Sequence, residues 1–257
     1  LDPTLAVENP KRHTNRKKGY ALSLTEEQIN RLIAISADSH GLKTHVIHEK
    51  GRLEALGSIC GAAERLRVKN IHGHHDFFAN EMRWSTQEAE RTRDGLDINT
   101  MEMSLVEQIG LRAASDPAAM DLLRTWNGGK GFESGARRNL AASSGVILFT
   151  MPSTAPIDIL SAGRAIQRAW LQASAMNLAS HPISAAIFLG HHASSAAQPA
   201  LTKEEKDEAL NLFDQLKSLF ALPKDEQPIF LLNISYSQKV SIRSLRLPLE
   251  AMVVEKK

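Results

Sequence analysis

The sequence predicts an α+β fold, in which helices cover a sheet. Residues 145–152 and 229–234 are runs of strand formers that are apolar enough to be buried central strands. Residues 163–182 indicate a long helix with small and apolar residues on nearly every side, and such a helix must be buried in a large core or against a partner chain. Strands and helices are mixed without a regular βαβ alternation, which favours α+β over α/β.

The composition bounds the kind of protein. A chain of 257 residues fits one large domain or two small ones and can bury a substantial core. The formal net charge of +2, without a long basic stripe, argues against nucleic acid as a partner. No apolar run approaches about 18 residues without charges, so we expect no membrane-spanning helix.

The cysteine count and the N-terminus concern the setting of the chain. Cys60 is the single cysteine, which excludes an intramolecular disulfide and a cysteine-based metal cage and favours a cytoplasmic location. The chain begins at Leu1 without a methionine or a signal peptide, so a fragment of a longer chain is one interpretation.

The first part of the chain alternates an arm, helices and a short strand. Residues 1–22 are predicted to form an N-terminal arm, polar and basic over most of its length. Thr25 and Gln28 have the spacing of a capping box and predict a helix start, with Gly41 at the helix end. A short strand over residues 43–49 and a helix over residues 52–69 follow.

The middle part is predicted to be largely helical. A second helical piece carries Phe77, Phe78 and Met82, and residues 84–103 are polar and irregular. Helical patterns follow at about 104–115 and 117–126, a glycine-rich break at 127–131, and a short helix that runs to Ala142.

The last part contains the long helix and the second apolar strand. The long helix is expected from about Pro156, a favourable first-turn residue, to Ser180. Residues 183–189 indicate a strand or a short helix, and residues 191–200 a loop of small residues. Thr202 caps a charged amphipathic helix that runs to Leu222.

An arginine-rich cluster in the arm is the strongest candidate site. Arg12, His13, Thr14, Asn15 and Arg16 place two guanidinium groups beside a hydroxyl and an amide. Guanidinium forks bind phosphate through two parallel hydrogen bonds, and short polar side chains complete the coordination of such an anion. A solvated basic loop is the alternative interpretation of the same residues.

The cluster also resembles a motif of a known family. Arg12, His13, Thr14 and Arg16 are spaced like an Arg-Arg-Ser-x-Arg type motif, with which FMN-dependent nitroreductases hold the phosphate and ribityl oxygens of FMN. His13-Thr14-Asn15-Arg16-Lys17 is similar to a His-Thr-Asn-Arg-Arg signature of a divergent branch. In that branch one chain carries two nitroreductase-like halves, and some members are fused to a ThiF-like adenylating domain.

Three further segments carry the same resemblance. Trp84 with Arg93-Asp94-Gly95-Leu96 looks like a lid or insertion of that branch, which would span residues 80–103 here. The tail from Arg246 to Val254 is similar to the family's ending, and it makes Arg243 and Arg246 candidates for phosphate contact. The long helix matches the family's central helix, in which Gln167 is either a cofactor contact or an interface glutamine. The matching helix positions are Gly163, Gln167, Leu171, Ala173, Leu178, Ala179 and Pro182.

The resemblance implies a fold and an activity. The expected fold is one nitroreductase-like domain over residues 1–257, a central antiparallel sheet wrapped by helices. The expected cofactor is FMN, with a hydride passing from NAD(P)H through the flavin to a nitroaromatic, a quinone or a similar small acceptor. The expected assembly is a homodimer or an intrachain pseudo-dimer. No side chain is an obvious general acid, so no catalytic residue is assigned.

Two departures from the family pattern keep other functions open. Ile234-Ser235-Tyr236-Ser237 lacks the Gly and Pro that the family has in this segment, and an upstream Ser-x-x-Asn-x-Gln-Pro-Trp segment is missing. The alternatives are a non-catalytic flavin-binding or regulatory domain, and a C-terminal accessory domain of a ThiF-like adenylating protein.

Other motifs are interpreted as structural. His72, His74 and His75 lack the spacing of a metal site, and we expect solvated histidines near a helix end. The Asn127-Gly128-Gly129-Lys130-Gly131 segment lacks the first glycine and the hydroxyl residue of a phosphate-binding loop and indicates a turn. Cys60 lies on an apolar helix face and is expected to pack there.

Overall fold

A four-stranded antiparallel sheet lies at the centre of the computed structural model, which describes residues 3–34, 41–195 and 200–251. The strand order is β1-β4-β6-β5, and every neighbouring pair is antiparallel. The predicted α+β fold with a central antiparallel sheet is therefore confirmed. The strands are β1 (Lys43–Ile47), β4 (Gly145–Met151), β5 (Ala179–Pro182) and β6 (Gln227–Ser235).

β4 is one of the two inner strands, and each of its residues is buried. Its side chains alternate between two hydrophobic cores, one on each face of the sheet. Val146 and Leu148 belong to one core, whereas Ile147 and Phe149 belong to the other. A strand buried on both faces has a continuous apolar sequence, which is why residues 145–152 could be identified.

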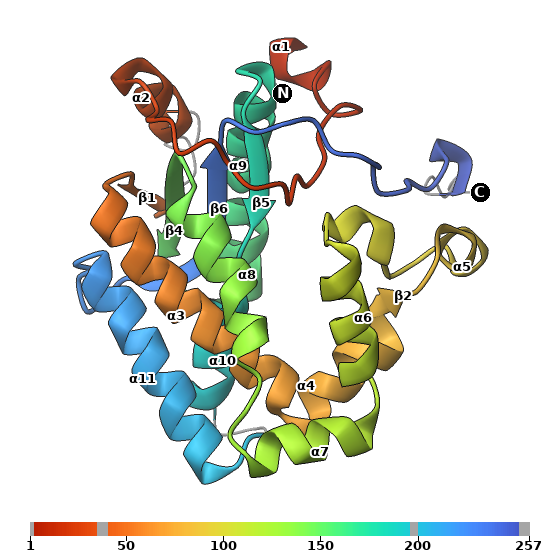
Figure 1. The fold of residues 1–257 in the computed structure, drawn as a ribbon. Helices are drawn as coiled ribbons and strands as arrows, with labels where there is room; N and C mark the ends of the chain where they lie inside the picture. Colours follow the sequence, from red (N-terminus) through yellow and green to blue (C-terminus); the bar gives the residue numbers. More distant parts are fainter. Residues whose placement is uncertain (1–2, 35–40, 196–199, 252–257) are drawn as a thin grey trace, which may run out of the picture.

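Four helices cover one face of the sheet (Figure 1). α3 lies against α8 so closely that a Cβ atom added at Gly61 would come within 2.8 Å of the Glu133 carbonyl oxygen. Cys60 is buried in this core, and desolvation raises the pKa of its thiol to about 12, so the predicted packing role is confirmed. The four helices are α3 (Lys50–Lys69), α8 (Lys130–Ala141), α10 (Ala185–Ser194) and α11 (Lys203–Leu219).

The long helix α9 (Pro156–Ala175) and α2 (Glu26–Ala34) cover the other face. Three alanines of α9, Ala162, Ala165 and Ala169, are fully buried against the sheet. The prediction of all-round burial for residues 163–182 is wrong at the start of that stretch, where Gly163 and Arg164 are exposed. The preceding turns of the helix also expose Ile157 (71%) and Leu160 (66%).

α9 ends at Ala175 rather than at the predicted Ser180. Asn177 has a left-handed backbone with φ of 56°, and the Leu178 N–H donates to the Ala173 carbonyl at 2.9 Å. Asparagine tolerates this conformation, which terminates a helix and turns the chain away. The following residues form β5, which pairs with the end of β6.

A smaller, mostly helical region over residues 71–125 stands beside the main body (Figure 1). Its own core contains Phe77, Phe78 and Met120. Residues 84–103, predicted to be irregular, contain several short elements instead. The region consists of α4 (Ile71–His75), a π-helical turn (Asp76–Glu81), β2 (Met82–Arg83), α5 (Thr86–Thr92), β3 (Leu96–Asp97), a 3₁₀ turn (Ile98–Met101), α6 (Leu105–Ala114) and α7 (Pro117–Thr125).

The N-terminal arm and the C-terminal tail run side by side across one end of the sheet (Figure 1). After the short α1 (Pro3–Ala6) and turns over residues 7–11, the arm continues without a helix, and the Tyr20 N–H donates to the Tyr236 carbonyl at 2.9 Å. Gly19 pairs with Ser237, and a Cβ atom at Gly19 would lie 2.3 Å from the Ala142 carbonyl oxygen. Only glycine allows the arm to lie this close. The tail ends in a 3₁₀ turn (Leu249–Ala251).

Two predicted helix starts are confirmed by their hydrogen bonds. Thr25 and Gln28 form the reciprocal capping box, with distances of 2.9 and 3.2 Å. Thr202 forms a second box with Glu205. The predicted end of the first helix, at Gly41, adjoins residues 35–40, which lie outside the described residues.

Two predictions about histidines are corrected. Most of residues 183–189, for which a strand or a short helix is predicted, belongs to α10 (Ala185–Ser194), which continues through His191 and His192 where a loop is expected. His74 is buried rather than solvated, because its Nε2 is 2.9 Å from the Ala114 carbonyl oxygen and its ring packs against Phe78. No helix of the described residues is long and apolar enough to cross a membrane.

Candidate anion-binding site

Arg12 of the arm stacks on Trp170 of α9. The guanidinium carbon lies 4.4 Å from the centre of the indole ring, within the range of a cation–π contact. The Nε atom of Arg12 and the Nε1 atom of Trp170 are buried without a hydrogen-bond partner. Buried donors are normally paired, so two orphaned N–H groups at one contact indicate a place where an acceptor is expected.

Arg246 of the tail joins this pair. Its Nη2 donates a hydrogen bond to the backbone carbonyl of Arg12. Burial, and then the neighbouring charge of Arg246, lower the pKa of Arg12 from its ordinary value. Two guanidinium groups held together in this way repel each other, and an anion between or beside them would remove that repulsion.

Arg16, the second arginine of the arm, lies near His181 of β5. Arg16 donates from Nη1 to the Thr100 carbonyl at 3.2 Å, and burial lowers its pKa. Burial, and then the charge of Arg16, lower the pKa of His181 on β5 to about 3. The His181 imidazole is therefore neutral near neutral pH, with one ring nitrogen able to accept and the other to donate.

No carboxylate of the described residues forms an ion pair with Arg12, Arg16 or Arg246. Seven other arginines that the structure describes do have such a partner, whereas the charges of Arg12 and Arg246 are held next to each other without one. The paired arginines are Arg31, Arg52, Arg65, Arg67, Arg83, Arg124 and Arg138.

The other predicted residues of the arm have different surroundings. Asn15 is buried and ties the arm down, because its side chain donates to the Gln238 carbonyl at 2.8 Å and accepts from the Lys17 N–H at 2.9 Å. His13 is half-buried, and its Nδ1 is 2.7 Å from the Lys11 carbonyl oxygen. Thr14 is half-buried between Arg12 and Arg16 in the chain. Asn15 thus fixes the backbone of the arm between Arg12 and Arg16 to the tail.

Gln167 and Arg243 lie at the margin of the cluster. Gln167 is one turn before Trp170 on α9, and its Nε2 donates to the Asn9 side chain at 3.4 Å. Arg243 is exposed in the tail, three residues before Arg246. The structure therefore brings Arg12 and Arg246 together and places Arg16 beside His181. Gln167 lies one turn from Trp170, and Arg243 is exposed in the tail.

Sequence reasoning missed Trp170 and His181. Trp170 and Gln167 are three residues apart on one helix and therefore share a face. A contact of the arm with Gln167 would have indicated a contact with Trp170 as well. His181 follows directly after Ser180, the predicted end of the helix. Only the early helix end at Ala175 places it on a strand beside Arg16.

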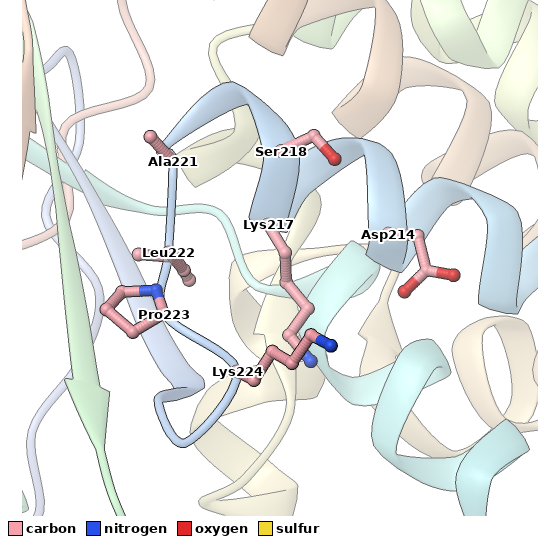
Figure 2. A pocket seen from close by; sticks show the side chains of 7 residues that line it. All are labelled: Asp214, Lys217, Ser218, Ala221, Leu222, Pro223 and Lys224. Carbon is pink, nitrogen blue, oxygen red and sulfur yellow. The ribbon is translucent and has the colours of Figure 1, made fainter.

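The structure also contains two open hollows away from the arginine cluster. One, of about 290 Å³, lies at the C-terminal end of α11, and Figure 2 shows Lys217 and Lys224 reaching toward each other across it in this view. Cations are favoured at a helix C-terminus, so these lysines are explained without a ligand. The other, of about 360 Å³, lies between α3, α7 and α11 and is lined by Arg65, Lys69, Arg124 and Glu208, among others.

Metal binding has no support in the part of the chain that is described. Within residues 3–34, 41–195 and 200–251, no group of three His, Cys, Asp or Glu side chains could hold a metal ion. His72 and His75 are exposed, whereas His74 is engaged with Ala114.

Solved structures share the fold of this chain. An FMN-dependent nitroreductase from Clostridium difficile R20291 superposes with a TM-score of 0.50 at 13% identity, covering 97% of this chain and 98% of its own. A nitroreductase with bound FMN from Bacteroides fragilis NCTC 9343 superposes with a TM-score of 0.51 at 11% identity, covering 98% of both chains. Nitroreductase A from Vibrio parahaemolyticus RIMD 2210633 superposes with a TM-score of 0.50 at 10% identity, covering 98% of this chain and 76% of its own.

These likenesses establish a nitroreductase-like fold, as the sequence predicted. No protein-family model matches the sequence, and no curated protein matches it significantly.

Proposed function

We propose that this chain is an FMN-binding oxidoreductase of the nitroreductase type. The single observation that carries the proposal is the pair of orphaned donors at Arg12 and Trp170, beside Arg246 and without a carboxylate partner among the described residues. A phosphate group satisfies such donors and neutralises such charge. The shared fold supports FMN as the phosphate-bearing ligand.

The residues present fit the phosphate end of FMN. Arg12 and Arg246 would hold the phosphate, because their guanidinium groups are adjacent and Arg12 keeps a free buried N–H. Arg16, Thr14 and His13 would bind the ribityl hydroxyls, since they supply donors and acceptors next along the arm. Gln167 and Arg243 would contribute from the margin, and Asn15 would hold the arm in place through Gln238.

When bound, FMN would carry a hydride from NAD(P)H to a small acceptor such as a nitroaromatic or a quinone. The role of the chain is to bind, to orient and to exclude water. His181 would meet the ligand as a neutral imidazole, because its pKa of about 3 keeps it uncharged. A neutral donor or acceptor is compatible with proton uptake from solvent rather than from a dedicated acid.

We also propose that the protein acts as one domain per chain and forms a homodimer. Ile157, Leu160 and Arg164 lie on one exposed face of α9 at i, i+3 and i+7. A Cβ atom added at Gly163 would meet nothing within 4 Å, so the face is open to a neighbour. Ile157 and Leu160 are the two large apolar side chains of this face, and exposed apolar surface of this kind supports an interface.

The test begins with the absorbance spectrum of the purified protein, followed by titration with FMN. Flavin absorbance in the purified protein, or quenching of FMN fluorescence on titration, is the expected result. A colourless protein that also rejects added FMN would overturn the proposal. Titration with FMN, riboflavin and inorganic phosphate separates recognition of the phosphate from recognition of the ring.

A non-catalytic flavin-binding domain is the second candidate. The arm lies directly on residues 235–237, in the segment where the expected glycine and proline are absent. Gly19 thus lies close to the Ser235 side chain, which favours a changed cofactor environment. Oxidation of NAD(P)H with a nitroaromatic or a quinone distinguishes the two candidates, since only the enzyme turns over.

A further inference from the structure

Three segments that are far apart in the sequence meet at the carboxylate of Glu102. Glu102 Oε2 is 3.2 Å from the Nζ of Lys17 in the arm. In the tail, the Ser241 N–H donates to Oε1 at 2.6 Å and the Ser241 hydroxyl to Oε2 at 2.9 Å. The Glu102 side chain is only 9% exposed.

The backbone of Glu102 has a conformation that is uncommon for a residue other than glycine. Glu102 has φ of 56°, a left-handed conformation that is unfavourable for a residue with a side chain. Strain of this kind persists where surrounding contacts impose it, and it is concentrated at functional sites. The contacts with Lys17 and Ser241 are the ones that hold the side chain in place.

The same stretch of chain also contacts the arginine cluster. The Thr100 carbonyl accepts the hydrogen bond from Arg16, two residues before Glu102. Arg16 and Lys17 are adjacent in the arm, so the 96–103 segment holds two consecutive arm residues. Burial would raise the pKa of Glu102, but the bonds from Ser241 and Lys17 outweigh it and lower the pKa, which keeps the carboxylate charged.

We propose that Glu102 is a positioning residue that fastens the 96–103 segment onto the arm and the tail and thereby orients Arg16 for the ligand. The part of this proposal that concerns the ligand rests on the proposed FMN site. The fastening itself concerns the free protein. Loss of the carboxylate releases the 96–103 segment, the Lys17 side chain and the Ser241 backbone together.

The first test is hydrogen exchange of the full chain without ligand, comparing wild type with Glu102→Gln. We expect amide exchange to become about tenfold faster in residues 97–103, 15–20 and 239–242, while β4 is unchanged. Unchanged exchange in these three segments overturns the proposal.

The matched control is Glu8→Gln. The Glu8 side chain is 13% exposed and pairs with Lys11 at 2.7 Å, so the same chemical change removes an ion pair within the arm alone. Exchange in residues 97–103 and 239–242 should stay as in wild type. If Glu8→Gln loosens those segments equally, the effect is not specific to Glu102 and the proposal fails.

The second test measures FMN binding by fluorescence quenching. Glu102→Gln should weaken binding about tenfold, and Glu8→Gln should not. If wild type does not bind FMN, the proposed function fails, while hydrogen exchange still decides the fastening. If exchange rises but FMN affinity is unchanged, the positioning role is overturned. Lys17→Gln, which removes the ion pair from the arm side, serves if Glu102→Gln does not fold.

Discussion

The guanidinium carbon of Arg12 lies 4.4 Å from the centre of the Trp170 ring. The indole face stabilises a cation that the fold has partly removed from water, so the aromatic ring takes the place of a carboxylate. A carboxylate partner would occupy the N–H groups of Arg12, whereas the ring leaves the Nε donor available. This relationship makes the cluster receptive to an outside anion, and the first prediction follows from it.

Arg12→Ala should weaken FMN binding by about 10- to 100-fold, since hydrogen bonds to a charged group contribute about 1.5–3 kcal/mol. Arg12→Lys should be intermediate, because the charge remains but the paired donors are lost. The dissociation constant from flavin fluorescence quenching measures both.

The control for this prediction is Arg31→Ala on α2, which removes an exposed arginine paired with Glu27 at 2.7 Å. Its FMN affinity should equal that of wild type. Equal affinity of Arg12→Ala and wild type would contradict the phosphate assignment.

Gly19→Ala should displace the arm. The added Cβ would lie 2.3 Å from the Ala142 carbonyl oxygen, so the pairing of Gly19 with Ser237 cannot persist unchanged. We expect a loss of about 1–3 kcal/mol in the free energy of unfolding and weaker FMN binding. Urea unfolding gives the first quantity and fluorescence titration the second.

Gly135→Ala is the matched glycine substitution. Gly135 lies inside α8, and an added Cβ would meet nothing within 4 Å. Alanine is the better helix former there, so the protein should gain about 0.5–1 kcal/mol. If both substitutions change the free energy of unfolding in the same direction, the close contact with Ala142 is not what makes Gly19→Ala destabilising.

Glu226 should make stability depend on pH in the acid range. Its side chain is 4% exposed and accepts hydrogen bonds from Lys43 at 2.6 Å, His45 at 2.7 Å and Thr150 at 2.8 Å. Burial alone would raise the pKa of Glu226, but these bonds outweigh it and lower the pKa. Because the pKa is lower in the folded state, the charged carboxylate stabilises the protein at pH values above the ordinary pKa of glutamate. This stabilisation is lost as the pH falls through the lowered pKa of the folded state.

Glu226→Gln should therefore cost about 1–3 kcal/mol at neutral pH. The difference from wild type should shrink as the pH falls below 4.5, the ordinary pKa of glutamate. Urea unfolding at several pH values measures this. Glu27→Gln, in an exposed pair, should change stability by less than about 1 kcal/mol, and a constant difference for Glu226→Gln at every pH would refute the prediction.

Leu160→Glu should convert the proposed dimer to a monomer. The Leu160 side chain is 66% exposed on α9, so the change costs the single chain little but places a charge in the interface. Sedimentation velocity gives the molecular mass. Phe188→Glu changes a side chain that is 62% exposed on α10 and should leave the dimer intact. A wild-type monomer would remove the basis of the proposal.

Local features of the fold were predictable because their causes are local. The capping boxes at Thr25 and Thr202 depend on residues three apart, and both form. The apolar run of β4 follows from burial on both faces. The end of α9 was placed wrongly because Asn177 is a weaker stop signal than glycine, and apolar residues continue past it.

The short elements within residues 84–103 were not predicted, although the caps of two of them are local: Ser85 accepts from the Glu88 N–H and Asp97 from the Asn99 N–H. β2 and β3 are two residues each and pair only with each other. The backbone at Glu102 likewise depends on Lys17 and Ser241. Periodicity carries no signal over such short segments.

The sequence by itself determined that residues 12–16 carry two guanidinium groups beside a hydroxyl and an amide, that two strands are buried, and that a long helix lies between them. Each of these features depends on residues that are close together in the sequence, because side-chain chemistry and the pattern of apolar residues are local properties. Tertiary structure decided which arginines meet. The arm crosses the end of the sheet beside the tail, and this brings Arg12 to Trp170 and Arg246 and brings Arg16 to His181. The close packing at Gly19 and the early end of α9 set that geometry, and both depend on contacts between distant parts of the chain.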